Sequence, residues 1–218
     1  MRNRFFKYFT EAKHAELFLD GKLFFRTLRY FSEYEDGDVR GDANEGTNLY
    51  RPIQGLELNM ADGRTLPMHG SEFRSSVVKG EIYVFCMSMS YSDELAKEFK
   101  SVVCVEVRDK RQFLQLTTAV LKTKGEQVFV GPVAYRSVSE PPRQRWAVPE
   151  LICMTKSTEF RRQFEYRIAF GKPEVFRPEN VEVKLVPQGH RDAPNSTHHE
   201  SATINVGSIR ELCFVRTT

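Results

Sequence analysis

Short runs of aromatic and β-branched residues recur along the chain, each bounded by glycine, proline or small polar residues. Runs of this kind predict β-strands. The expected strands are residues 5–9, 23–27, 81–89, 102–107, 128–135 and 164–170, and residues 204–215 are expected to be strand material with a turn that begins at Ser208. A weaker alternation within residues 50–80, interrupted by an Ala-Asp-Gly-Arg turn at 61–64, predicts a hairpin.

Three candidate N-cap residues precede segments with apolar residues at helical spacing. Thr10 can cap a helix that ends at Gly21. Ser92 can cap a short helix over residues 92–99, and Asp109 can start a longer one. The apolar faces of the first and last helix would be Ala12, Ala15, Phe18 and Leu19, and Phe113, Leu116, Val120 and Leu121. Many strands with few short helices indicate the α+β class, with mixed and mostly antiparallel sheets.

The length of 218 residues suits one domain with an insertion better than two domains. We expect a single domain over 1–218, with an irregular insertion around 36–80 and a flexible polar loop at 187–201. Hydrophobic residues make up 40% and charged residues 28%, which is typical of a globular chain and not of a disordered one.

The cysteines indicate a reducing compartment. Cys86, Cys104, Cys153 and Cys213 are far apart in the sequence, and none belongs to a Cys-x-x-Cys pair. We expect free, structural thiols in a cytoplasmic protein. The basic start of the chain leads into no apolar stretch typical of a signal peptide, and no run is long enough to span a bilayer. We therefore expect no membrane partner.

Two short polar motifs are the best candidates for chemistry. Ser88-Met89-Ser90 ends a predicted buried strand, and Gln163-Phe164-Glu165 opens a late one. Alternate residues of a strand share a face, so Gln163 and Glu165 are expected side by side. Each motif alone is also what ordinary strand alternation produces. Arg167 alternates with Glu165 and could equally be its ion-pair partner.

The order of these motifs resembles the ADP-ribosyltransferase superfamily, whose arginine-serine-glutamate branch has a basic first strand, a Ser-x-Ser strand and a Gln/Glu-x-Glu strand. The resemblance implies that fold, with NAD as co-substrate. Glu165 would then be the catalytic carboxylate that stabilises positive charge on the ribose, and Gln163 would orient the nucleophile. The spacing of about 75 residues between the two motifs is longer than is usual for that branch.

The remaining NAD contacts are assigned by the same resemblance. Ser88 and Ser90 would orient the ribose or the nicotinamide amide. Lys7, Tyr8 and Arg26 are candidates for the pyrophosphate and ribose, and the sequence does not choose among them or Arg4.

A second resemblance covers nearly the whole chain. It is to a family of uncharacterised bacterial domains with a Tyr-Lys-Tyr-like first strand, an acidic loop, a Cys-Phe-Ser-like strand and a late Glu-x-Arg strand. The counterparts here are Phe6-Lys7-Tyr8, 36–46, Cys86-Met87-Ser88 and Glu165-Tyr166-Arg167. This resemblance implies no established chemistry.

The leading hypothesis is a glycosyltransferase that moves ADP-ribose from NAD to a macromolecule. The net charge of +3 and the arginine-rich stretches favour a nucleic-acid acceptor over a small molecule, and a protein acceptor stays open. The resemblance implies a bacterial toxin or antiviral-defence effector, and whether an antitoxin neutralises it stays open.

Two other functions stay open. Basic residues interleave with aromatic ones in the first strand and at Arg143-Gln144-Arg145-Trp146, as in non-catalytic modules that bind single-stranded nucleic acid or protein. Acidic residues of the loop 36–46 could instead serve a metal-dependent nuclease, although a solvated loop is the simpler interpretation and no metal site is assigned. Those acidic residues are Asp36, Asp38, Asp42 and Glu45.

Overall fold

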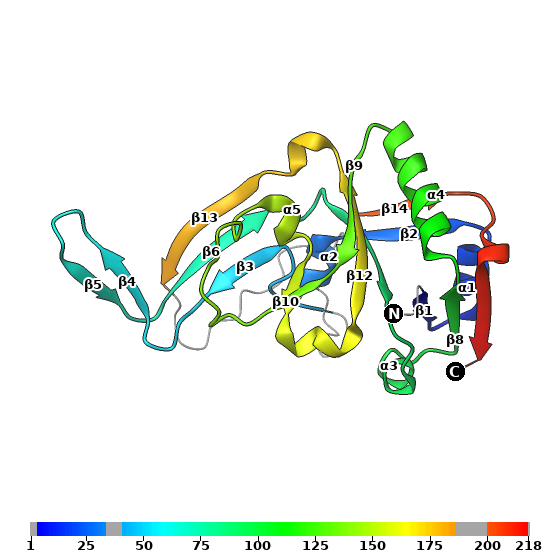
Figure 1. Ribbon diagram of the computed structural model, residues 1–218, viewed down its shortest axis with the longest axis horizontal. Coiled ribbons are helices and arrows are strands. Elements are labelled where there is room, and N and C mark those ends of the chain that lie inside the picture. The colour runs from blue at the N-terminus through cyan, green and yellow to red at the C-terminus, as the bar shows by residue number, and fades with distance from the viewer. Residues whose placement is uncertain (1–3, 34–40, 186–199, 218) are drawn as a thin grey trace.

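The computed structural model describes residues 4–33, 41–185 and 200–217 (Figure 1). Its main sheet follows the order β14-β2-β7-β1-β8-β15, and β12 and β9 extend it from β7. All pairs in this sheet are antiparallel. Its strands are β1 (Phe5–Phe9), β2 (Lys22–Thr27), β7 (Tyr83–Ser88), β8 (Val103–Val107), β9 (Gln127–Pro132), β12 (Glu165–Gly171), β14 (Ser201–Asn205) and β15 (Cys213–Thr217).

The other strands form three smaller sheets. An antiparallel sheet has the order β13-β6-β3, a hairpin joins β4 to β5, and β10 and β11 pair in parallel. These strands are β3 (Thr47–Tyr50), β4 (Leu56–Asn59), β5 (Thr65–Met68), β6 (Ser71–Val77), β10 (Ala134–Arg136), β11 (Thr155–Ser157) and β13 (Pro178–Leu185). The β4–β5 hairpin projects at one end of the molecule, and β15 lies at the opposite end (Figure 1).

The helices are short except for one. The α-helices are α1 (Ala12–Leu19), α2 (Leu28–Glu33), α3 (Asp93–Glu98), α4 (Lys110–Thr123) and α5 (Pro149–Ile152). The 3₁₀ turns are η1 (Thr158–Gln163), η2 (Pro173–Val175) and η3 (Arg210–Leu212). In the described part of the chain, no helix is long and apolar enough to cross a membrane.

One face of the main sheet is covered by α1 and α4. Phe18 of α1 stacks on Phe85 of β7 at 5.9 Å, and Phe113 of α4 meets Phe5 of β1 edge-on at 6.5 Å. These rings are buried and carry most of the core on this side. The aromatic pairs explain why the strand at β1 is so rich in phenylalanine.

The opposite face is covered in separate parts. At β7 and β12 it packs against α2, α5 and the end of β6, with Leu28, Ile82 and Ile152 in the apolar cluster. At β1 and β8 it packs against α3 through Leu95 and Ala96. Polar and charged side chains lie between these two apolar clusters, and they form the site described below.

The α+β class with mostly antiparallel sheets is confirmed. The 50–80 hairpin is confirmed as β4–β5. Ser92 caps α3 by accepting a hydrogen bond from the backbone N of Leu95 at 3.3 Å, and Asp109 caps α4 in the same way through the N of Gln112 at 2.9 Å.

Other expectations need correction. Glu11, and not Thr10, is the N-cap of α1. The 128–135 strand is divided at Val133, whose N–H bonds to the carbonyl of Glu165 (2.9 Å) while the chain turns to pair with β11. The described part of the 36–80 segment is not irregular, because it supplies β3 to β6. Most of the 187–201 loop lies outside the described residues.

Candidate functional site

The main sheet places the strand that begins at Glu165 beside the strand that ends at Ser88. Glu165 and Ser88 are Cα partners in the pair β12–β7, and Phe6 of β1 is also a partner of Ser88. Partners in a sheet project to the same face. Side chains from three strands that are distant in sequence therefore meet at this point.

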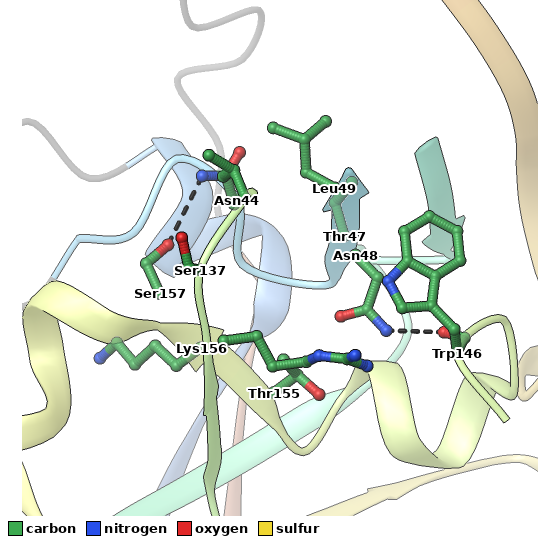
Figure 2. Close-up of a pocket in the computed structure, with 11 residues that line it drawn as sticks. Asn44, Thr47, Asn48, Leu49, Ser137, Trp146, Thr155, Lys156 and Ser157 are labelled. Atoms are coloured by element: carbon green, nitrogen blue, oxygen red, sulfur yellow. Dashed lines mark hydrogen bonds between the residues drawn. The ribbon is translucent and has the colours of Figure 1, made fainter. Parts of the chain in front are cut away.

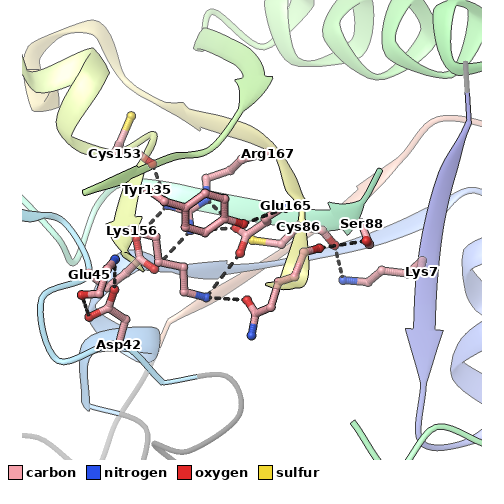
Figure 3. Close-up of polar contacts among 12 residues, drawn as sticks. Lys7, Asp42, Glu45, Cys86, Ser88, Tyr135, Cys153, Lys156, Glu165 and Arg167 are labelled. Atoms are coloured by element: carbon pink, nitrogen blue, oxygen red, sulfur yellow. Dashed lines mark hydrogen bonds and ion pairs between the residues drawn. The ribbon is translucent and has the colours of Figure 1, made fainter. Parts of the chain in front are cut away.

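The carboxylate of Glu165 lies inside a buried network of ion pairs (Figure 3). Its Oε1 accepts hydrogen bonds from Nε and Nη2 of Arg167, at 2.9 and 2.8 Å. Its Oε2 lies 3.3 Å from Nζ of Lys156. The side chains of Lys156 and Glu165 are only 4% and 6% exposed. Arg167 is thus an ion-pair partner of Glu165.

Arg167 also binds a second carboxylate, Glu45, which lies near the end of the acidic loop 36–46. Its Nη1 donates to Glu45 Oε1 at 2.7 Å, and its Nη2 lies 3.1 Å from Oε2. The Nη1 group donates as well to the carbonyl of Cys153, at 2.7 Å. Glu45 and Arg167 are both fully enclosed. The guanidinium of Arg167 therefore connects β12 to the segment just before β3 and to the segment just after α5.

Asp42 is used structurally at the same place. Its Oδ2 accepts a hydrogen bond from the backbone N of Ser157 at 2.8 Å, and its Oδ1 accepts one from the Ser157 hydroxyl at 3.0 Å. Asp42 and Glu45 are therefore buried and not solvated. Among the described residues, no group of three His, Cys, Asp or Glu side chains could hold a metal ion. Asp36 and Asp38 lie outside the described residues.

The charges in this network favour the ionised forms of Glu165, Lys156 and Arg167, whereas at Glu45 burial outweighs the cations and raises the pKa. Burial alone would raise the pKa of Glu165, but the charges of Arg167 and Lys156 outweigh it and hold that pKa well below its usual value. Burial would also lower the pKa of Lys156, yet the Glu165 and Glu45 carboxylates raise it. Two carboxylates, Glu165 and Glu45, thus face two cations, Arg167 and Lys156.

Gln163 reaches this network by a route that alternation did not predict. It ends η1, and Phe164 adopts a left-handed conformation (φ 43°) before β12 begins at Glu165. Gln163 and Glu165 are therefore not alternate positions of one strand. Their side chains still converge, because Oε1 of Gln163 accepts a hydrogen bond from Lys156 Nζ at 3.0 Å.

Ser88 contacts the Gln163 backbone and not the ionic groups. Its hydroxyl lies 2.8 Å from the carbonyl oxygen of Gln163 and 2.7 Å from that of Ser90, and it accepts a hydrogen bond from the Ser90 N–H. Ser88 thus links the turn that follows β7 to the end of η1. The hydroxyl of Ser88 is nearly enclosed, with the residue 6% exposed.

The candidates on the first two strands have other partners. Lys7 donates to the carbonyl of Cys86 at 2.7 Å. The Tyr8 hydroxyl accepts a hydrogen bond from the backbone N of Ser92 at 2.9 Å, beneath α3. Arg26 lies over the ring of Tyr30 at 4.4 Å. Within the described residues, no hydrogen bond or ion pair joins Tyr8 or Arg26 to Glu165.

A second charged group lies on the β1–β8–β15 part of the sheet, on the face that carries α3. Glu106 of β8 is buried, and Arg4, Arg108 and Arg216 gather around its carboxylate. Burial would raise the pKa of Glu106, but hydrogen bonds and charge from Arg216 hold it below its usual value. Sequence analysis missed this group, because its members come from three separate segments. Lys156 was missed in the same way.

Comparisons with protein-family models, characterised proteins and solved structures give no match. The function of this chain is therefore inferred from its own geometry.

Proposed function

We propose that this protein binds single-stranded nucleic acid on the face of the main sheet formed by β1, β8 and β15. The observation that carries the proposal is the arginine cluster around Glu106. Three guanidinium groups share one carboxylate, so two positive charges are left unmatched within the cluster. Such an excess attracts phosphate groups.

An exposed aromatic ring lies among these charges. Phe214 is the Cα partner of Glu106, and its ring is 44% exposed. The guanidinium carbons of Arg108 and Arg216 lie 4.3 and 5.7 Å from the centre of this ring. Aromatic rings flanked by arginines on a sheet face are typical of surfaces on which bases stack while the cations contact the phosphates.

Further aromatic rings lie next to Glu106 towards the middle of the main sheet. Phe6 of β1 is the Cα partner of Glu106 from the other side, and Tyr91 packs over Phe6 with ring centres 5.9 Å apart. Phe6 is buried and Tyr91 is half-buried, so Phe214 is the most exposed ring of the three. The first strand suggested nucleic-acid binding in the sequence, but its Phe6 packs beneath the proposed surface. The ring proposed to contact a base is Phe214 of β15.

The test is fluorescence anisotropy with labelled single-stranded RNA and DNA over a range of salt concentrations. Phe214→Ala should weaken binding by about 5- to 150-fold, the cost of one lost base stack of roughly 1–3 kcal/mol. Arg108→Ala should lower the slope of log affinity against log salt by about 0.7 to 0.9, as expected for one lost phosphate contact. Arg108 is preferred to Arg216, because its longer contact with Glu106 (3.8 Å) leaves that carboxylate paired when it is removed.

Arg64→Ala is the matched control. Arg64 is 71% exposed, pairs with Asp62 and lies on the β4–β5 hairpin at the other end of the molecule. The Arg64→Ala variant should bind single-stranded nucleic acid like the unaltered protein. If Arg108→Ala and Phe214→Ala also bind like the unaltered protein, this face is not the binding surface.

A second candidate function is transfer of ADP-ribose from NAD to nucleic acid. The observation that favours it is the convergence of the Gln163 and Glu165 side-chain oxygens on one cation, the ammonium of Lys156, at 3.0 and 3.3 Å. Cleavage of the nicotinamide bond develops positive charge on the ribose, and the same pair of oxygens would stabilise it. Lys156 occupies that position and would have to swing away for NAD to enter.

The transferase test is incubation with labelled NAD and RNA or DNA. Glu165→Gln should abolish labelling, whereas Glu159→Gln, an exposed position on η1, should not. Circular dichroism must show that the Glu165 variant is folded. Persistence of labelling in a folded Glu165→Gln protein would exclude the proposed catalytic role.

A further inference from the structure

A hollow at the β9 end of the main sheet combines cationic and apolar walls. It has a volume of about 280 Å³ and lies between β9, β10 and α5. Its apolar wall consists of Pro132, Ala134, Leu151 and Met154. Its cationic wall consists of Arg136, Arg143 and Arg145. This hollow shares no residue with the Glu106 face or with the Glu165 network, and only a smaller adjoining hollow is lined by Lys156.

We propose that the hollow binds a phosphate group carried on a nucleoside. The phosphate would contact the arginines, and the base would lie on the apolar wall. The ligand would be a free mononucleotide or the phosphorylated end of an oligonucleotide, which present the same chemistry. This site goes beyond the nucleic-acid surface proposed above and does not depend on it.

The charge at the hollow is strongly positive. Glu140 is the only acidic partner that the described contacts give these arginines, lying 3.5 Å from Arg136 and 3.4 Å from Arg143. Three guanidinium groups and one carboxylate leave two positive charges unmatched. These separations are long for a charge-assisted hydrogen bond, so a phosphate can compete for the guanidinium N–H groups with little loss.

The segment that carries two of the arginines is held rigidly. Trp146 is buried and stacks on Phe73 with ring centres 4.8 Å apart and an interplanar angle of 18°. Its carbonyl accepts a hydrogen bond from Nδ2 of buried Asn48 at 2.6 Å (Figure 2). Its N–H bonds to the carbonyl of Arg143 at 2.9 Å, which closes a turn. The backbone that carries Arg143 and Arg145 is therefore held in place, although both residues are exposed.

Polar groups lie where the edge of a base would reach. Asn48, Arg136 and Thr155 line both this hollow and a smaller adjoining one of about 20 Å³. The smaller hollow also contains Ser137 and Ser157 (Figure 2). A ligand with one anionic end, an apolar ring face and polar ring edges fits this arrangement of walls.

The test is isothermal titration calorimetry with adenosine monophosphate, adenosine, and an oligonucleotide with or without a 5′-phosphate. Adenosine monophosphate should bind and adenosine should bind at least tenfold more weakly, because charge-assisted hydrogen bonds to the phosphate are lost. Arg143→Ala and Arg145→Ala should each weaken binding by about tenfold or more. Arg111→Ala, an exposed arginine on α4, should have no effect.

The two sources of phosphate are separated by the oligonucleotides. Tighter binding of the 5′-phosphorylated strand than of adenosine monophosphate, lost in Arg145→Ala, identifies a strand end as the ligand. Binding of the mononucleotide alone identifies a free nucleotide. Phe214→Ala should leave mononucleotide binding unchanged, so this site and the Glu106 face can fail separately. Equal binding of adenosine and adenosine monophosphate, no binding of any phosphate compound, or unaltered binding in both arginine variants overturns the proposal.

Discussion

Arg167 binds Glu165 through two hydrogen bonds to a single oxygen, with Nε and Nη2 lying 2.9 and 2.8 Å from Oε1. The same Nη2 lies 3.1 Å from a carboxylate oxygen of Glu45, so one buried guanidinium joins two carboxylates. Removing one member of such a group leaves a buried charge without its partner. This relationship has direct consequences for stability.

Glu165→Gln should destabilise the protein by about 3–5 kcal/mol at neutral pH, because Arg167 and Lys156 lose a buried counter-charge. Urea unfolding followed by circular dichroism measures this. Glu98→Gln is the control, since Glu98 forms a similar pair with Arg162 at the surface, where the side chains are 32% and 48% exposed. It should cost less than about 1 kcal/mol. Equal losses in the two variants would contradict the buried ionic network.

The stability of the protein should fall as the pH drops below about 4.5. In the folded state the Glu165 pKa is held well below its ordinary value of 4.5, so the unfolded chain binds more protons in this range. The contribution of Glu165 is complete above pH 4.5 and is lost towards its folded pKa. Unfolding free energies measured from pH 7 to 3 should therefore decline less steeply in Glu165→Gln than in the unaltered protein. Identical slopes would show that Glu165 is not ionised in its ion pairs.

Gly21→Ala should destabilise the protein more than Gly63→Ala. Both glycines have positive φ, 81° and 83°, so both substitutions carry a backbone penalty of roughly 1–2 kcal/mol. A Cβ at Gly21 would also lie 1.8 Å from the carbonyl oxygen of Gly207, whereas one at Gly63 meets nothing within 4 Å. The difference in melting temperature between Gly21→Ala and Gly63→Ala measures how closely the backbones at Gly21 and Gly207 approach each other. A difference of zero would place Gly207 elsewhere.

The four cysteines should react slowly with a thiol reagent at pH 8 in the folded protein and quickly in urea. Burial raises the pKa of Cys86, Cys104, Cys153 and Cys213 to about 12, so hardly any thiolate is present. All four are free in the structure. A fast phase in the native protein would identify a thiol more accessible than these positions allow.

The sequence by itself determined most of the elements. Period-two runs of aromatic and β-branched residues located β1, β2, β7 and β8, and side-chain caps located α3 and α4, because these signals are local. Thr10 was wrong as the N-cap of α1. The residue at which the helix begins depends on where β1 stops pairing with β8, and the sequence near Thr10 does not show that. The strands β3 and β6 were missed, because their sequences are polar and their partners are distant.

The tertiary structure alone decided what the charged residues do. The sequence marked Glu165 and Arg167 as alternating, and it could not reveal that Lys156 and Glu45 complete their environment from positions 9 and 122 residues away. It placed Gln163 on the same strand as Glu165, whereas a left-handed Phe164 separates them. Arg4, Arg108 and Arg216 share Glu106 only because β1, β8 and their neighbours are paired in the sheet. Long-range pairing of charges leaves no local pattern, since electrostatic contacts depend on distance in space and not along the chain.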